Sequence, residues 1–282
     1  MSTINFYIPG FTKHLGLNLS LARYLEQHRE CFYDNIKIAS LYGSFPNAIW
    51  NGGRCEFGDV DIPKFKDIVS EVNALGIAIR YTFTNCLIKE EHLSDEYCNR
   101  LMCLCDNGMN EVLVNSPLLE KYLRSIYPGF KYILSTTALI RGAKSIDEAC
   151  NNYDLVVADY RDVKNKTFLQ EISRRDKVEI LLNEACVLDC QYRSNHYERI
   201  SQSQLSLKDT HEEKKCMYHD TTKFREAYIS KETLYEILIP MGYKHFKLRG
   251  RESGSEKLID EYLTYLVRPE YKEAVRHDLG KA

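Results

Sequence analysis

The sequence lacks a long apolar run, an excess of either charge and an export signal. No apolar stretch reaches the roughly 18 residues that a membrane-spanning helix requires, so we expect no membrane span. The N-terminus has no basic segment followed by an apolar block, which favours a cytoplasmic location over secretion. The formal net charge of −2 argues against a surface that generally coats nucleic acid, but it leaves room for a local basic patch.

Two common hydrolase motifs are also absent. The chain has neither the His-Glu-x-x-His of many zinc peptidases nor the Gly-x-Ser-x-Gly of serine hydrolases. A peptidase activity would therefore need another water-activating metal, or a cysteine nucleophile such as Cys186 with His196 as its base. Because repeats, low-complexity segments and domain linkers are missing too, we interpret residues 1–282 as one domain.

What the chain does have is a regular alternation of apolar, β-branched runs with amphipathic segments. The runs expected to form strands are 36–42, 77–83, 111–115, 130–135, 155–159, 177–183, 225–229 and 245–248. Parallel strands joined by crossover helices form either an open sheet or a closed barrel, and eight units favour the barrel. The sequence therefore predicts an α/β fold, a (β/α)8 TIM barrel with its core at about residues 36–268.

Three parts of the sequence are expected to lie outside the regular alternation of strands and helices. A strand at 4–8 and a helix at 15–29 precede it, and the strand is expected to pack across the bottom of the barrel. Residues 194–224 are polar and are expected to form a long loop over the site. A helix at 256–267 completes the last unit, and a helical piece after Pro269 forms a C-terminal extension.

The ten cysteines point to metal chemistry in one place only. Their irregular spacing and the missing export signal favour reduced thiols over a disulfide framework. Cys186 and Cys190 are three residues apart in the loop after strand 177–183, and Cys216 follows. Thiolates suit iron–sulfur clusters or zinc, although two plain free thiols remain the alternative. The candidates for a fourth ligand are Cys55, His196 and His219.

Cationic side chains are expected at the same end of the barrel. Arg249 and Arg251 follow the last strand, and Arg193 lies in the cysteine loop. Because guanidinium groups grip carboxylates and phosphates with two hydrogen bonds, these residues predict an anionic substrate or a nucleic acid as the partner. The alternative is that Arg249 or Arg251 forms an ion pair with Glu184 or Glu252 and stiffens the barrel mouth.

Further polar residues follow the predicted strands. Glu184 and His196 could transfer protons near a metal, or they could serve only as hydrogen-bond partners of other site residues. Asn85 and Asn183 stand at strand ends, where substrate-binding residues of such barrels collect.

Several of these segments resemble the collagenase-like peptidase family, peptidase U32. The run 130–137 is similar to a family strand that ends in Ser-Thr-Gln, and 247–251 is similar to the family's Lys-Ile-Glu-Gly-Arg signature. The run 178–186 is similar to its Val-Glu strand that leads into a cluster cysteine. The resemblance implies a TIM barrel with a [4Fe-4S] cluster, acting in oxygen-independent hydroxylation of RNA or a small-molecule precursor, with a partner protein of the same family.

The chain departs from this family at residues that matter for chemistry. The signature glutamate is Arg249, the glutamine after Ser-Thr is Thr137, and the second cysteine pair is reduced to Cys216. The resemblance therefore implies ligation by Cys186 and Cys190 with Cys216, and with Cys55 as the fourth ligand. Two alternatives remain: a metal- or cysteine-dependent peptidase, and a non-enzymatic barrel that has lost the cluster and only binds a ligand or partner.

Overall fold

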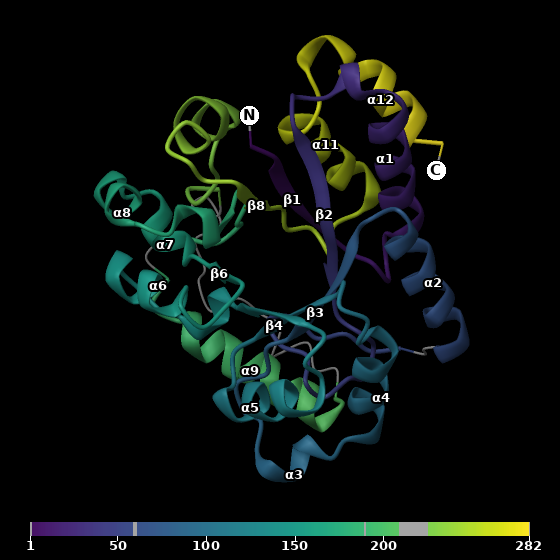
Figure 1. Cartoon of the computed structure of the whole chain (residues 1–282), viewed down its shortest axis with the longest axis vertical. Helices are drawn as coiled ribbons and strands as arrows, with labels where there is room; N and C mark the ends of the chain where they lie inside the picture. The colour runs from purple at the N-terminus through teal and green to yellow at the C-terminus, as the bar shows by residue number, and fades with distance from the viewer. Residues whose placement is uncertain (1, 59–60, 189, 209–224, 282) are drawn as a thin grey trace.

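The computed structural model, described here for residues 2–58, 61–188, 190–208 and 225–281, contains a closed barrel of parallel strands in chain order (Figure 1). The strands are β1 (Ile4–Pro9), β2 (Ile36–Gly43), β3 (Ala78–Phe83), β4 (Glu111–Val114), β5 (Lys131–Leu134), β6 (Leu155–Val157), β7 (Val178–Leu181) and β8 (His245–Lys247). The predicted (β/α)8 TIM barrel is thereby confirmed.

Two strand assignments from the sequence were wrong. The segment 4–9 does not cross the bottom of the barrel, because β1 pairs with β2 on one side and with β8 on the other and closes the ring. Residues 225–229 form no strand; a turn leads to Ile229, whose N–H donates to Leu182 O at 2.8 Å. The barrel therefore starts at residue 4. The predicted number of eight strands was right because leaving β1 out of the barrel offset the wrongly added strand at 225–229.

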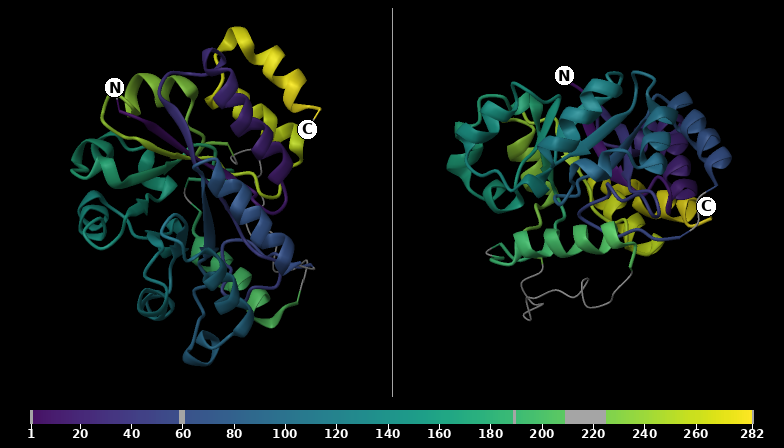
Figure 2. Two further views of the ribbon diagram at one scale, coloured as in Figure 1. Left: turned by 45° about the vertical axis from the view of Figure 1, so that its right-hand side comes forward. Right: turned by 90° about the horizontal axis from the view of Figure 1, so that it is seen from below.

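Most of the helices surround this ring of strands, and another crosses one end of it (Figure 2). They are α1 (Leu15–Gln27), α2 (Ile62–Ala74), α3 (Glu90–Leu93), α4 (Glu96–Cys105), α5 (Pro117–Ile126), α6 (Ala143–Ala149), α7 (Tyr160–Val163), α8 (Lys166–Glu171), α9 (Arg193–Ser206), the π-helical segment η5 (Thr233–Leu238), α11 (Ser255–Tyr265) and α12 (Lys272–Leu279). Among the described residues no helix is both long and apolar enough to cross a bilayer, as expected.

Local sequence explains where the main helices begin. Asp61 accepts a hydrogen bond from the N–H of Lys64 and Pro63 occupies the first turn, so α2 starts as the sequence predicted. Ser116 and Pro117 do the same for α5. Helices α1, α11 and α12 lie side by side (Figure 1), and the hydroxyl of Tyr262 ties α11 to α1.

Helix α9 corrects the expected loop at 194–224. Residues 193–206 are helical, and the helix runs across one end of the barrel (Figure 2). Its C-terminal half is fastened to the loops after β2 and β3, because Gln204 exchanges hydrogen bonds with the backbone of Glu56 and the carbonyl of Ser201 accepts one from Asn85. The buried side of α9 includes serine and glutamine, so its sequence carries no clear amphipathic pattern.

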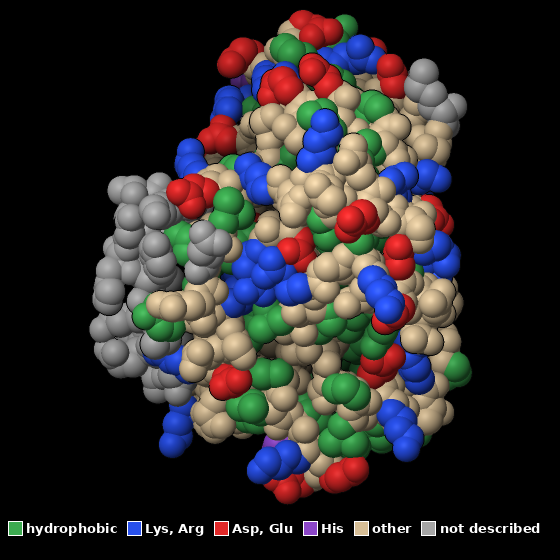
Figure 3. Space-filling model, turned by 90° about the vertical axis from the view of Figure 1, so that its left-hand side faces the viewer, with side chains coloured by type: hydrophobic (Ala, Val, Ile, Leu, Met, Phe, Trp, Pro, Cys, Tyr) green, Lys and Arg blue, Asp and Glu red, His purple; other side chains and the backbone are tan. Residues whose placement is uncertain are grey.

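The barrel interior holds charged side chains that the sequence analysis did not identify. Arg80 on β3 donates to Glu111 Oε2 at 2.6 Å and to Glu179 Oε2 at 2.5 Å, and its side chain has no solvent exposure. The guanidinium also lies 3.9 Å from the ring centre of Tyr7. On the surface shown in Figure 3, basic and acidic side chains are interspersed, in keeping with the small net charge.

The loop after β2 combines a packing anchor with site residues. Trp50 is fully buried and donates to His92 O at 2.8 Å. Gly52 follows, where an added Cβ would lie 2.3 Å from the carbonyl oxygen of Thr84 and 2.6 Å from the backbone nitrogen of Asn85. These neighbours are backbone atoms and cannot swing away, so only glycine fits at position 52.

We therefore predict that Gly52→Ala lowers the free energy of unfolding by about 1–3 kcal/mol, the usual cost of overpacking. The matched control is Gly16→Ala, an exposed position of α1 with no atom within 4 Å of the added Cβ. The control should be neutral or stabilising by up to about 1 kcal/mol. Urea unfolding of both variants measures the difference; equal effects would show that the loop moves aside freely.

Candidate functional site

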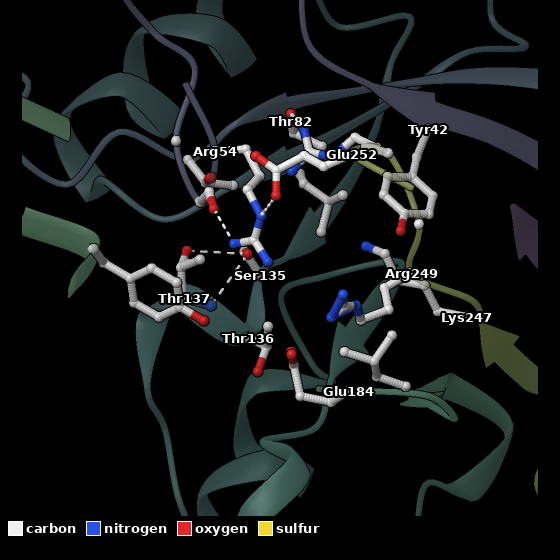
Figure 4. A pocket seen from close by; sticks show the side chains of 18 of the residues that line it. Tyr42, Arg54, Thr82, Ser135, Thr136, Thr137, Glu184, Lys247, Arg249 and Glu252 are labelled. Atoms are coloured by element: carbon white, nitrogen blue, oxygen red, sulfur yellow. Dashed lines mark hydrogen bonds and ion pairs between the residues drawn. The ribbon is translucent and has the colours of Figure 1, made fainter. Parts of the chain in front are cut away.

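A pocket with a cavity volume of about 100 Å³ opens at the end of the barrel where the strands terminate at their carboxyl ends (Figure 4). Its walls come from the loops after β2, β5, β7 and β8 and from helix α9. The charged side chains that line it are Arg54, Glu184, Arg193, Lys247, Arg249, Arg251 and Glu252. Cations exceed carboxylates in this set, so the cavity favours a negatively charged ligand.

Arg251 enters the pocket from the loop after β8 and is held by neutral groups. Its Nη1 atom donates to Ser44 Oγ at 2.5 Å and to Thr82 Oγ1 at 3.1 Å. The guanidinium also lies 5.8 Å from the ring centre of Tyr42. Burial lowers the pKa of Arg251, but an arginine still stays charged at neutral pH. Hydroxyl groups fix its position without cancelling its charge.

Arg249 is placed by its backbone rather than by its side chain. Its N–H donates to Asn183 Oδ1 at 2.7 Å and its carbonyl accepts from Asn183 Nδ2 at 3.2 Å. Within the described part of the chain, no carboxylate lies within 4 Å of the guanidinium of Arg249 or of Arg251. Asn183 therefore joins the ends of β7 and β8, and the two arginines bring positive charge to the cavity without an ion pair of their own among the described residues.

Arg54 is a site residue that the sequence analysis missed. It forms an ion pair with Glu252 at 3.0 Å and donates to Gly53 O at 2.5 Å. Gly53 itself has a φ of +72° and reverses the loop just before Arg54. The glycine-rich loop that carries it was the only available signal. Glu252 pairs with Arg54 and Glu184 pairs with Arg193. The alternative in which Arg249 or Arg251 forms an ion pair with one of these two carboxylates is therefore wrong, because no such pair lies within 4 Å.

Glu184 and Arg193 form a buried ion pair on the α9 side of the pocket. Arg193 Nη2 lies 3.3 Å from Glu184 Oε2, and the guanidinium stacks 4.4 Å from the Tyr160 ring centre and 4.9 Å from that of Tyr197. Burial raises the pKa of Glu184, but Arg193, Arg54 and Arg249 outweigh it, so the pKa is lowered overall. Glu184 is therefore a carboxylate at neutral pH and can accept a proton.

His196 and Asn85, two predicted site residues, are not among the residues that line the cavity. Burial, followed by the charges of Arg54 and Arg193, lowers the pKa of His196 to about 4, so its ring is neutral at pH 7. The amide of Asn85 donates to the carbonyls of Ile49 and Ser201 and holds α9 against the loops.

The predicted thiol ligands separate into different surroundings. Cys186 lies beside Cys190 and Tyr160, and burial followed by the nearby Cys186 thiol raises the pKa of Cys190. Cys55 donates instead to Ile200 O on α9 at 3.6 Å, and Cys216 lies outside the described residues. The nine cysteines that the structure describes are free thiols, as expected.

These thiols do not by themselves fit a [4Fe-4S] cluster. Such a cluster is held by about four thiolates, whereas nowhere in the described ranges do three His, Cys, Asp or Glu side chains converge on a position for a metal. Two neighbouring thiols, Cys186 and Cys190, are what the described residues supply. The cluster therefore stays a prediction.

Of the comparisons with known proteins, the one with solved structures bears on the fold. No protein-family model and no curated protein sequence matches the chain. Among solved structures, the fold is similar to that of the U32 peptidase Mk0906, with a TM-score of 0.59 and 14% sequence identity, covering 89% of this chain and 94% of that chain. This likeness confirms the resemblance to U32 peptidases at the level of the TIM barrel.

Two further structures match with lower similarity. An HpcH/HpaI aldolase from Desulfitobacterium hafniense DCB-2 has a TM-score of 0.34 at 9% identity, covering 98% of this chain and 93% of that chain. A family 39 glycoside hydrolase from Bacteroides cellulosilyticus WH2 has a TM-score of 0.32 at 11% identity, covering 72% of this chain and 53% of that chain.

Proposed function

We propose that this barrel binds a small carboxylate- or phosphate-bearing ligand in the pocket at its mouth. The observation that carries the proposal is the pair Arg249 and Arg251, which face the cavity without a carboxylate partner within 4 Å among the described residues. Both residues are partly buried, and holding two cations without an ion-pair partner away from water costs free energy unless a ligand supplies the opposite charge. An anion in the cavity would remove that cost and gain charge-assisted hydrogen bonds.

The pocket also has the parts that could act on such a ligand. Glu184 lines one wall as a carboxylate and can accept a proton, and Lys247 lines the pocket where β8 ends. Figure 4 shows Arg54, Arg249 and Glu184 directed toward the same space. The arrangement therefore supports binding of a small anion with proton transfer to or from it.

Calorimetric titration tests this proposal with phosphate, sulfate and short mono- and dicarboxylates. Arg249→Met and Arg251→Met should each weaken binding of the best ligand about 10- to 100-fold, because a hydrogen bond to a charged group contributes about 1.5–3 kcal/mol. The control is Arg100→Met, an exposed residue of α4 outside the pocket. Equal affinity of all three variants and the unaltered protein would contradict the proposal.

An iron–sulfur function in oxygen-independent hydroxylation is a second proposal, and the adjacency of the Cys186 and Cys190 thiols is what favours it. We expect protein purified anaerobically to contain iron and sulfide, and to lose both in the double variant Cys186→Ser/Cys190→Ser. Cys103→Ser, which removes an exposed thiol, should retain them. A colourless, iron-free protein would exclude this proposal without affecting the anion site.

The peptidase alternative gains no support from the geometry. Within the part of the chain that the structure describes, no hydrogen bond joins Cys186 to His196, and the neutral ring of His196 lies outside the pocket lining. A Cys–His pair acts as nucleophile and base only when the two groups lie within hydrogen-bonding reach.

A further inference from the structure

Lys247 is the one lysine among the residues that line the mouth pocket. It is the last residue of β8, and its side chain is 11% exposed. Its Nζ atom lies 3.6 Å from Glu179 Oε1, longer than the roughly 2.7–2.9 Å of a strong charge-assisted hydrogen bond. The amine also lies 4.2 Å from the ring centre of Tyr42. It is thus buried, in reach of the cavity and only loosely paired.

The groups around Lys247 favour its neutral form. Burial is the largest cause, and the charges of Arg80 on β3 and Arg251 after β8 add to it, whereas Glu179 on β7 opposes them. Together they lower the pKa of Lys247 to about 8. An exposed lysine has a pKa near 10.4. The fraction of Lys247 that is neutral at physiological pH is therefore larger than that of an exposed lysine. Lysines that attack carbonyl carbons are activated in this way, by desolvation and neighbouring cations.

We propose that Lys247 is a nucleophile that forms an imine with a small 2-oxo acid whose carboxylate is held by Arg249 and Arg251. The inference rests on the proposed anion site and names its substrate class. A 2-oxo acid has its carbonyl carbon bonded directly to the carboxylate carbon, so one short molecule can meet the arginines and the amine together. The cavity volume of about 100 Å³ suits a compound of a few carbon atoms.

The step is balanced without any further reactant. The lone pair of the neutral Lys247 amine attacks the carbonyl carbon, the new C–N bond forms, and the carbonyl π electrons move to oxygen. Two protons from nitrogen then reach this oxygen, which leaves as water while the C=N bond forms. Glu184, a carboxylate in the same pocket, can accept and return one of these protons. The products are the imine and one water molecule.

Reductive trapping tests this inference on the full chain. The protein is incubated with pyruvate, glyoxylate or 2-oxobutyrate and sodium cyanoborohydride, and the modified residue is located by peptide mass spectrometry. We expect the adduct at Lys247 to exceed that at Lys144, whose side chain is 92% exposed, by at least tenfold. The initial rate should rise between pH 7 and pH 9 as Lys247 loses its proton.

Variants separate chemistry from folding and from binding. Lys247→Arg keeps the charge beside Glu179 and should abolish the adduct while leaving the circular dichroism spectrum unchanged, and Lys144→Arg should leave labelling of Lys247 intact. Absence of an adduct at Lys247 with all three oxo acids, or equal labelling of Lys144, overturns the inference. If the unaltered protein still binds anions by calorimetry in that case, the proposed anion site stands. If the unaltered protein binds no anion at all, the proposed function itself is refuted.

Discussion

Arg80→Met should lower the free energy of unfolding by about 3–5 kcal/mol, the usual cost of removing one partner from a buried ion pair. The reason is that Glu111 and Glu179 would keep their charges inside the barrel without the guanidinium that now bonds to both. The side chains of Arg80 and Glu179 have no solvent exposure, so water cannot replace the lost partner. The midpoint of urea unfolding measures the effect.

Two companion variants make this prediction specific to the buried charge. Arg23→Met breaks an ion pair with Glu71 in which both side chains are about half exposed, and it should cost no more than about 1 kcal/mol. The triple variant Arg80→Met/Glu111→Gln/Glu179→Gln removes the orphaned carboxylates and should recover part of the loss. A cost for Arg80→Met no larger than that for Arg23→Met would show that the interior charges are hydrated.

Arg193→Met is expected to have a comparably large effect, about 3–5 kcal/mol at pH 7, because it leaves the buried carboxylate of Glu184 without its nearest cation. In the unaltered protein the lowered pKa of Glu184 gives stability above its unfolded pKa, and this is lost as pH falls through the folded pKa. In the variant only Arg54 and Arg249 remain to oppose burial, so we expect the pKa of Glu184 to be higher than in the unaltered protein. The penalty is then present at neutral pH and is relieved as pH falls.

The measurement is the difference in unfolding free energy between the unaltered protein and Arg193→Met at several pH values. The difference should be largest at pH 7 and should shrink toward pH 4 as Glu184 takes up a proton. The double variant Arg193→Met/Glu184→Gln should be more stable than Arg193→Met alone at pH 7. A pH-independent difference would contradict the role of Glu184 and leave only lost stacking on Tyr160 and Tyr197 as its source.

The barrel could be predicted because its strands are mostly apolar runs separated by turn and capping residues. Helix α9 could not, because its buried side contains Ser201, Ser203 and Gln204. Ser201 and Gln204 form hydrogen bonds with loops distant in sequence, and Ser203 donates to the carbonyl of Lys208 just past the helix. Strand β1 was misplaced for a different reason. An apolar run of this kind is expected both for a strand across the bottom of the barrel and for a strand within it. Only the pairing with β2 and β8 shows that β1 is part of the barrel.

The site was predictable to the extent that it lies at strand ends. Glu184, Arg193, Arg249 and Arg251 do line one pocket, as the rule that strand C-termini meet on one face implies. Arg54 was missed because its loop is irregular. The sequence pattern also gave no reason to place charged side chains inside the barrel, since interior positions usually carry apolar ones. The structure nevertheless has linked charges there, on Arg80, Glu179 and Lys247.

The most direct test of the anion site is a crystal structure of the protein soaked in bromide, whose anomalous scattering locates the bound ion. The structure predicts a bromide ion in the mouth cavity within contact of the Arg249 and Arg251 guanidinium groups, and its absence from crystals of Arg249→Met/Arg251→Met. Bromide bound only at the outer surface, with the cavity empty of anions in the unaltered protein, would contradict the proposal.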